Sequence, residues 1–212
     1  VMCLSGVKKY LTAAMIMLFV SFTLRFSVSA AHKVLLQQGI AEEVLRFHVL
    51  ANSDSREDQE MKLLVRDQAV AWMEETVALA EQEAGRELNR EEVAALMEEQ
   101  LPALEEKANR ILQDQGAAYQ AKVSLEECYF PKRTYGTCTF PSGWYQALRL
   151  CLGEARGKNW WCVLYPKLCF TDSLHAVMPE EELEKLKEVL TAEEYESLFE
   201  SPEEWKISFR WF

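Results

Sequence analysis

The chain has 212 residues, of which 49% are hydrophobic and 27% are charged, and its formal net charge at pH 7 is −11. This length suits one domain of ordinary size with a sizeable buried core. The excess of acidic over basic side chains, 34 against 23, argues against nucleic-acid binding, which requires clustered lysine and arginine.

The first thirty residues have the organisation of a secretory signal. Lys8 and Lys9 precede an uncharged stretch over residues 10–24, and the small residues at 28–30 fit a cleavage site. Arg25 ends the apolar stretch short of the ~20 residues that a membrane-spanning helix needs, which favours a cleaved signal over an uncleaved anchor. In either case we expect the rest of the chain to leave the cytoplasm.

A short apolar segment follows this signal. Residues 44–50 are rich in apolar and β-branched side chains, which predicts a strand that ends at an Asn-Ser-Asp-Ser turn. That turn also predicts the start of a helix, because Ser55 with Asp58 fits an N-terminal capping pattern. Asp54 with Glu57 is the competing cap.

Two helices are predicted next. Apolar residues at helical spacing indicate a long amphipathic helix over roughly 56–82, which Gly85 ends. Asn89 starts a second amphipathic helix that stops at Gly116, and Pro102 should kink it or divide it after Leu101. The short polar loop between the two helices predicts an antiparallel pair.

The remainder of the chain changes to a period of two, which predicts strands. Two short acidic helices, near 180–189 and 191–199, interrupt this series. We therefore expect residues 31–212 to form a single α+β domain, with a mostly antiparallel sheet covered on one face by the long helices. The predicted strands are 119–126, 134–140, 148–152, a segment containing Val163 and Leu164, and a final strand at 205–212.

Cysteine usage leaves two possibilities open. Of six cysteines, Cys3 lies in the signal, so the exported part retains an odd number, and at least one thiol is unpaired or bonded between chains. Cys128 and Cys138 lie symmetrically about Arg133, where a hairpin could bring them opposite each other. Buried free thiols are the alternative, since cysteine is among the most buried residue types.

Several motifs resemble catalytic or metal-binding sites without meeting their requirements. Three residues separate Gly153 from Gly157, whereas a Walker loop needs four, and Asn159 follows Lys158 where Ser or Thr is required. His48 is explained by a hydrogen bond within a strand, and the carboxylates at 54, 58 and 67 need no metal, since Asp54 suits a turn and cap. No pair of cysteines has zinc-site spacing, so we expect no metal and no cofactor.

The strongest argument for an enzyme is a Cys–His pair. Cys162 or Cys169 could supply a thiolate, with His48 or His175 as the base. Catalytic cysteines usually lie at the start of a helix, which lowers the pKa of the thiol. Cys162 instead begins an apolar run that is typical of an inert core thiol, so the enzyme remains the alternative.

The tandem tryptophans after this loop favour recognition over catalysis. Neighbouring strand residues point to opposite faces, so one of Trp160 and Trp161 should enter the core while the other stays partly exposed. An exposed tryptophan beside Lys158 and Asn159, with Tyr135 available, suits an anchor for a protein partner. The competing interpretation is structural, with each tryptophan packed on its own face of the sheet.

Three segments and the exported N-terminus together carry a resemblance to a known family. The segments are RFHVLANSDSREDQEMKLLVRD (46–67), FPKRTYG (130–136) and PSGWYQALRLCLGEARGKNWWCVLYPKLCF (141–170). Over residues 44–172 the chain resembles the stage II sporulation protein R family of endospore-forming bacteria. The resemblance implies a protein that is made in the forespore and exported into the space between forespore and mother cell. There it triggers a membrane-embedded aspartic protease, which removes the pro-sequence of the mother-cell sigma factor E. The family is a signal and not a known enzyme.

We therefore expect an exported intercellular signal whose partner is that protease, and the alternative is a cell-envelope enzyme with a Cys–His pair. A contact with a membrane surface is a third possibility, because residues 116–179 carry a net charge of +3 between acidic helices. We expect His48 and Asp54 to order the nearby end of the sheet. The expected contact surface consists of Arg133, Tyr135, Lys158, Asn159, Trp160 and Trp161.

Overall fold

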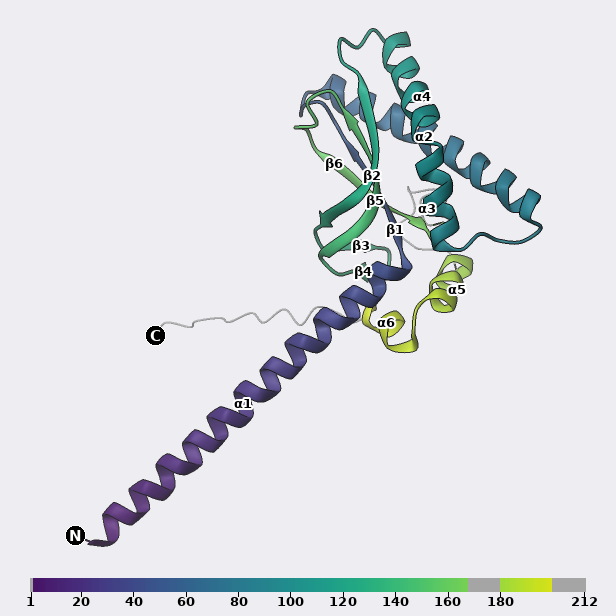
Figure 1. The fold of residues 1–212 in the computed structure, drawn as a ribbon. Coiled ribbons are helices and arrows are strands. Elements are labelled where there is room, and N and C mark those ends of the chain that lie inside the picture. The colour runs from purple at the N-terminus through teal and green to yellow at the C-terminus, as the bar shows by residue number, and fades with distance from the viewer. Residues whose placement is uncertain (1, 168–179, 200–212) are drawn as a thin grey trace.

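The computed structural model describes residues 2–167 and 180–199, with side chains described for 13–167 and 183–199. Its body is a four-stranded sheet in the order β2-β5-β1-β6 (Figure 1). β1 and β5 are parallel, and the other two neighbouring pairs are antiparallel, so the predicted α+β fold with a mostly antiparallel sheet is confirmed. The strands are β1 (Leu45–Leu50), β2 (Ala121–Phe130), β5 (Gly143–Leu152) and β6 (Asn159–Tyr165). The predicted strand 205–212, Cys169 and His175 lie outside the described residues.

The first long helix, α2 (Arg56–Ala84), begins and ends as its sequence predicts. The Ser55 side chain accepts a hydrogen bond from the Asp58 amide at 3.1 Å, so Ser55 and not Asp54 is the cap. At the other end Gly85 adopts a left-handed conformation with φ of 67°, which glycine reaches without steric strain.

The second predicted helix is divided into α3 (Arg90–Glu99) and α4 (Leu101–Asp114). Asn89 and Glu92 form a reciprocal capping box at the start of α3. The break falls at Gln100, and Pro102 lies in the first turn of α4, where its missing N–H has no helical partner to lose. The predicted division is therefore confirmed.

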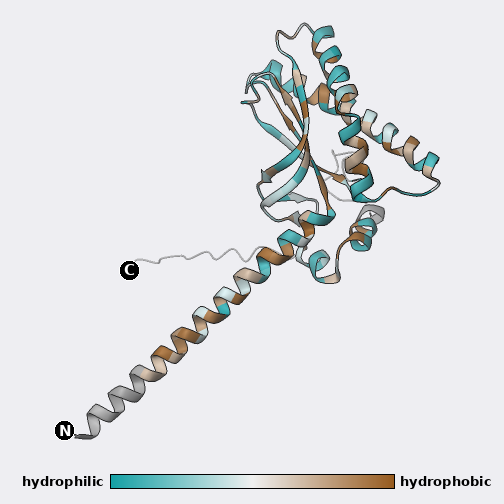
Figure 2. Ribbon diagram, in the orientation of Figure 1, coloured by the Kyte–Doolittle hydropathy of each residue, from teal (hydrophilic) through white to brown (hydrophobic). Residues whose placement is uncertain are grey.

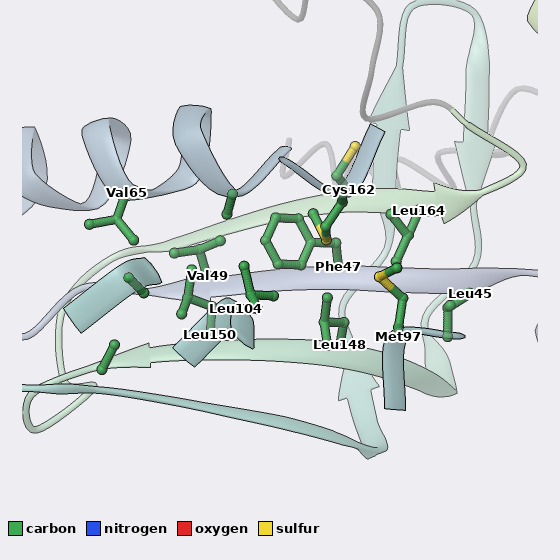
Figure 3. Packing of buried hydrophobic residues seen from close by; sticks show 14 of the residues in the cluster. Leu45, Phe47, Val49, Val65, Met97, Leu104, Leu148, Leu150, Cys162 and Leu164 are labelled. Carbon is green, nitrogen blue, oxygen red and sulfur yellow. The ribbon is translucent and has the colours of Figure 1, made fainter. Parts of the chain in front are cut away.

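These helices lie on one side of the sheet, and their apolar residues share a core cluster with it (Figures 1 and 3). Leu45, Phe47 and Val49 alternate along β1 and point into this cluster. Val65 of α2 and Leu104 of α4 meet them from the helical layer. The alternating apolar residues of β1 and the helically spaced apolar residues of α2 thus form two faces that pack against each other.

A second, smaller cluster covers part of the opposite face of the sheet. Val163 and Tyr145 contribute from the sheet, and Ile40 contributes from the end of α1 (Met2–Glu43). Leu186 of α5 (Glu180–Val189) and Leu198, just after α6 (Ala192–Ser197), complete it. The sheet therefore has apolar cover on both faces, and every residue of β1 is buried.

α1 has an exposed part and a docked part. Residues 13–35 are exposed and largely apolar, and they project away from the body (Figures 1 and 2). His32 Nε2 lies 2.9 Å from Glu193 Oε1 of α6, burial of α1 against the body begins at Leu36, and Ile40 is fully buried. The segment Ala13–Glu43 is long and apolar enough to cross a membrane, a property that signal sequences share. The predicted cleavage site at 28–30 falls within the exposed part.

The predicted hairpin about Arg133 is wrong. β2 stays paired with β5 as far as Phe130, which places Cys128 opposite Tyr145. A separate hairpin of β3 (Arg133–Tyr135) and β4 (Cys138–Phe140) turns instead at Gly136, whose φ of 59° suits a tight turn. All four cysteines with described side chains are free thiols: Cys128, Cys138, Cys151 and Cys162.

Candidate functional site

The turn after β1 and the loop between β5 and β6 are joined by hydrogen bonds. The Gly157 amide donates to the Ala51 carbonyl at 2.9 Å, and the Lys158 amide donates to Asp54 Oδ1 at 2.7 Å. The Asn52 side chain accepts from the Glu154 amide at 2.9 Å. Asp54 therefore fixes the loop that leads into β6 and does not cap α2.

The two glycines of this loop are required by close packing. A Cβ atom on Gly157 would collide with the Ser53 carbonyl oxygen, and one on Gly153 would collide with the Asn52 side chain. Gly153 also has a positive φ of 55°. The two glycines allow the β5–β6 loop to pack closely against the turn after β1. This close packing explains their presence without a phosphate-binding loop.

Asp58 extends this polar junction beyond what the sequence analysis foresaw. Its carboxylate accepts hydrogen bonds from Asn52 at 2.9 Å, Ser53 at 2.5 Å and Tyr119 at 2.6 Å. Burial by itself raises the pKa of the Asp58 carboxyl, but the hydrogen bonds from Ser53, Tyr119 and Asn52 outweigh it and lower the pKa. The sequence predicts Tyr119 only as part of a strand. Its hydrogen bond to Asp58, 61 residues away in the chain, leaves no signal in the sequence.

The tryptophans divide between the two faces of the sheet. Trp160 faces the helices. Its ring is edge-on to the Phe47 ring, with 5.7 Å between the ring centres, and its ring centre lies 5.1 Å from the Arg66 guanidinium carbon. Trp161 faces the opposite side of the sheet and stacks on the His48 ring, with 3.7 Å between the ring centres. Both are half-buried, so the expected contrast between a core and an exposed tryptophan is absent, and each packs on its own face.

His48 is the centre of a polar and aromatic surface on the face opposite the helices, which we call the His48 face. Its Nε2 lies 2.9 Å from Asn159 Oδ1, and the exposed Arg133 lies over the Trp161 ring at 5.5 Å. The structure thus brings together four of the six expected contact residues, and Lys158 and Trp160 lie elsewhere. The His48 face comprises Arg46, His48, Arg133, Tyr135, Arg149, Asn159 and Trp161.

Besides His48, Arg46 and Arg149 are the residues of this face that were not among the expected contact residues, and Arg46 is the more deeply buried of the two. Its side chain is fully buried, and its Nε donates to the Cys162 carbonyl at 3.1 Å while Nη2 donates to the Tyr135 hydroxyl at 3.0 Å. No carboxylate of the described residues forms an ion pair with it. The sequence signal that could have identified Arg46 is its basic side chain in a predicted strand that is mostly apolar. The guanidinium lies 4.5 to 5.7 Å from the ring centres of Phe130, Phe140, Tyr145 and Tyr135.

The surroundings of His48 keep its imidazole neutral. Burial, with a smaller effect from the positive charges of Arg149, Arg46 and Arg133, lowers the pKa of His48 to about 4, although the hydrogen bond to Asn159 raises it. With Asn159 Oδ1 accepting from Nε2, the proton of the neutral ring resides on Nε2.

The geometry excludes one of the proposed Cys–His pairs. Cys162 is packed in the cluster on the helical side of the sheet, whereas His48 lies on the other side. Burial also raises the pKa of the thiols of Cys128 and Cys138, to about 11 and about 12, which disfavours the reactive thiolate. Within the described residues, no group of three His, Cys, Asp or Glu side chains is arranged to hold a metal ion.

Comparison with known proteins places the described strands within one family. The family model for stage II sporulation protein R matches residues 41–175, which include all of β1 to β6. Stage II sporulation protein R of Bacillus subtilis (strain 168) is 31% identical over 150 residues, which cover 69% of this chain and 62% of that protein. The chain thus spans less than two thirds of that relative, and no solved structure matches. On this evidence the chain belongs to the stage II sporulation protein R family.

Proposed function

We propose that this protein is an exported sporulation signal. It is made in the forespore and acts in the space between forespore and mother cell, where it binds and activates a membrane-embedded aspartic protease that processes pro-sigma E. Membership of the family and the exposed apolar part of α1, which is consistent with an export signal, support this proposal. The protein acts by binding and not as an enzyme.

The observation that carries the binding role is the composition of the His48 face. The Trp161 ring contacts both the His48 ring and the Arg133 guanidinium, and its side chain is only partly buried, so part of it remains accessible to a partner. Tryptophan and arginine are the side chains that most often dominate the energetics of protein interfaces. We place the receptor contact here and not at Lys158 or Trp160, because Trp160 packs against the helical side.

The test is coexpression of this chain with the membrane protease and its pro-sigma substrate, with cleavage of the substrate as the measurement. Arg133 is exposed, so Arg133→Ala should leave the melting temperature unchanged and reduce cleavage severalfold. Arg56→Ala is the matched control, because Arg56 is an exposed arginine on α2, away from the His48 face. Equal cleavage by both variants would move the receptor contact off this face.

A further inference from the structure

Four buried nitrogen atoms of the His48 face lack any hydrogen-bond partner within the described residues: Arg46 Nη1, His48 Nδ1, Arg149 Nε and Trp161 Nε1. The strand register places Arg149 and Trp161 directly beside His48, one on each side, and Arg46 lies two residues earlier on the same face. Buried polar groups are paired in the great majority of cases, and each unpaired one costs about 1–3 kcal/mol. Such a concentration on one surface indicates that an acceptor is supplied from elsewhere.

The charge of this surface specifies the kind of acceptor. Three of the unpaired atoms are N–H donors, namely those of Arg46, Arg149 and Trp161. The only described ion pair of these side chains joins Arg149 to Glu126, at the edge of the face. A carboxylate, which only accepts hydrogen bonds and carries a negative charge, satisfies such donors better than a neutral group.

We propose that the His48 face binds an acidic segment of the protein partner, with a carboxylate of that segment accepting hydrogen bonds from Arg149 and Trp161. This inference rests on the proposed function and names the chemistry of its receptor. The negative charge of such a partner segment would complement the positive charge of the His48 face, which is basic although the chain as a whole is acidic.

Binding requires a side chain to move, because the four unpaired atoms are shielded from solvent. Arg133 is exposed and lies over the Trp161 ring, so its guanidinium is the group that an incoming carboxylate meets first. Arg133 thus offers the initial attraction, and Arg149 and Trp161 offer the directional hydrogen bonds.

The experiment uses the full chain in a non-ionic detergent, with isotope-labelled tryptophan. The probe is a capped peptide that alternates glycine with glutamate, and the comparison peptide carries glutamine in place of glutamate. The measured signal is the indole N–H resonance of Trp161, which Trp161→Phe assigns. The glutamate peptide should shift this resonance saturably, and the glutamine peptide should not.

Variants connect this shift to the guanidinium groups. Arg149→Gln should weaken the binding of the glutamate peptide about tenfold or more, as expected for the loss of a charge-assisted hydrogen bond. Arg110→Gln is the matched control, because Arg110 also pairs with a glutamate but lies on α4. Arg133→Gln alters an exposed side chain, so it keeps the test valid if Arg149→Gln fails to fold, and it should weaken binding severalfold.

Three outcomes would overturn the inference. The first is an equal response to both peptides, and the second is a Trp161 shift with phosphatidylglycerol vesicles alone, which would indicate a lipid surface. The third is a shift that depends on protein concentration without peptide, which would indicate a second copy of the chain. If any of these occurs while Arg133→Ala still impairs substrate cleavage, the receptor contact stands and only its carboxylate chemistry is wrong.

Discussion

His48 and Arg46 are neighbours on one strand face, and they respond differently to burial. The imidazole loses its charge, because its pKa falls to about 4 and the neutral ring can stack on Trp161. A guanidinium stays protonated in proteins, so Arg46 remains a cation among four aromatic rings. The interior of the His48 face therefore keeps a fixed positive charge beside a ring that is neutral at physiological pH.

The neutrality of His48 makes the stability of the fold depend on pH. The unfolded chain binds a proton near pH 6.5, whereas the folded protein binds it only near pH 4, so protonation favours unfolding. The contribution of His48 to stability is complete above pH 6.5, declines as the pH falls toward 4, and amounts to about 3 kcal/mol at most. The measurement is denaturant unfolding at pH 7 and pH 4.

His48→Phe isolates this contribution, since phenylalanine keeps a ring beside Trp161 and binds no proton. Between pH 7 and pH 4 the parent protein should lose more stability than His48→Phe. An unchanged pH dependence in His48→Phe would mean that the ring is already charged in the folded protein.

At the scale of elements, the β5–β6 loop is held by the turn after β1. Gly157→Ala should destabilise the fold by about 2–3 kcal/mol, because the added methyl group collides with backbone that cannot rotate away. Gly116→Ala should cost only about 1 kcal/mol, since Gly116 has a positive φ but open space around it. Thermal unfolding of both variants measures the difference, and equal losses would show that the loop shifts freely.

Elements that depend on neighbours in sequence could be predicted, and those that depend on distant segments could not. The Ser55 cap, the Asn89 capping box and the break beside Pro102 are local, and their positions were foreseen to within two residues. The hairpin was misplaced because symmetric cysteine spacing carries no information on which strand extends further.

The candidate site follows the same division. Contact residues were chosen from one loop and one turn, and the structure unites four of them with His48. Arg46 shares a face of β1 with His48, as alternation along one strand predicts. Arg149 joins the site through the parallel pairing of β1 with β5, across about a hundred residues of chain, which alternation within single strands does not encode.

At the scale of the whole molecule, α1 is both a projecting segment and part of the body. Deleting residues 1–30 should leave a cooperatively folded body, because the first contact of α1 with the body is at His32 and burial begins only at Leu36. Deleting residues 1–43 should lower the melting temperature by several degrees, since it removes the fully buried Ile40 from the second cluster. Calorimetry of the two truncations checks this, and equal melting temperatures would show that the docked end of α1 adds nothing to stability.

The unbroken course of α1 also bears on how far the protein can act. Its exposed stretch, residues 13–35, is about 35 Å long at the usual helical rise, close to the ~30 Å thickness of a bilayer's hydrocarbon core. If α1 stayed in the membrane, this stretch would be consumed in crossing it, and no flexible spacer would separate the bilayer from the docked turn at Leu36. The body would then be held against that membrane. Cleavage at residues 28–30 would free it to diffuse, so under the proposed function proteolysis would set the range over which the signal travels.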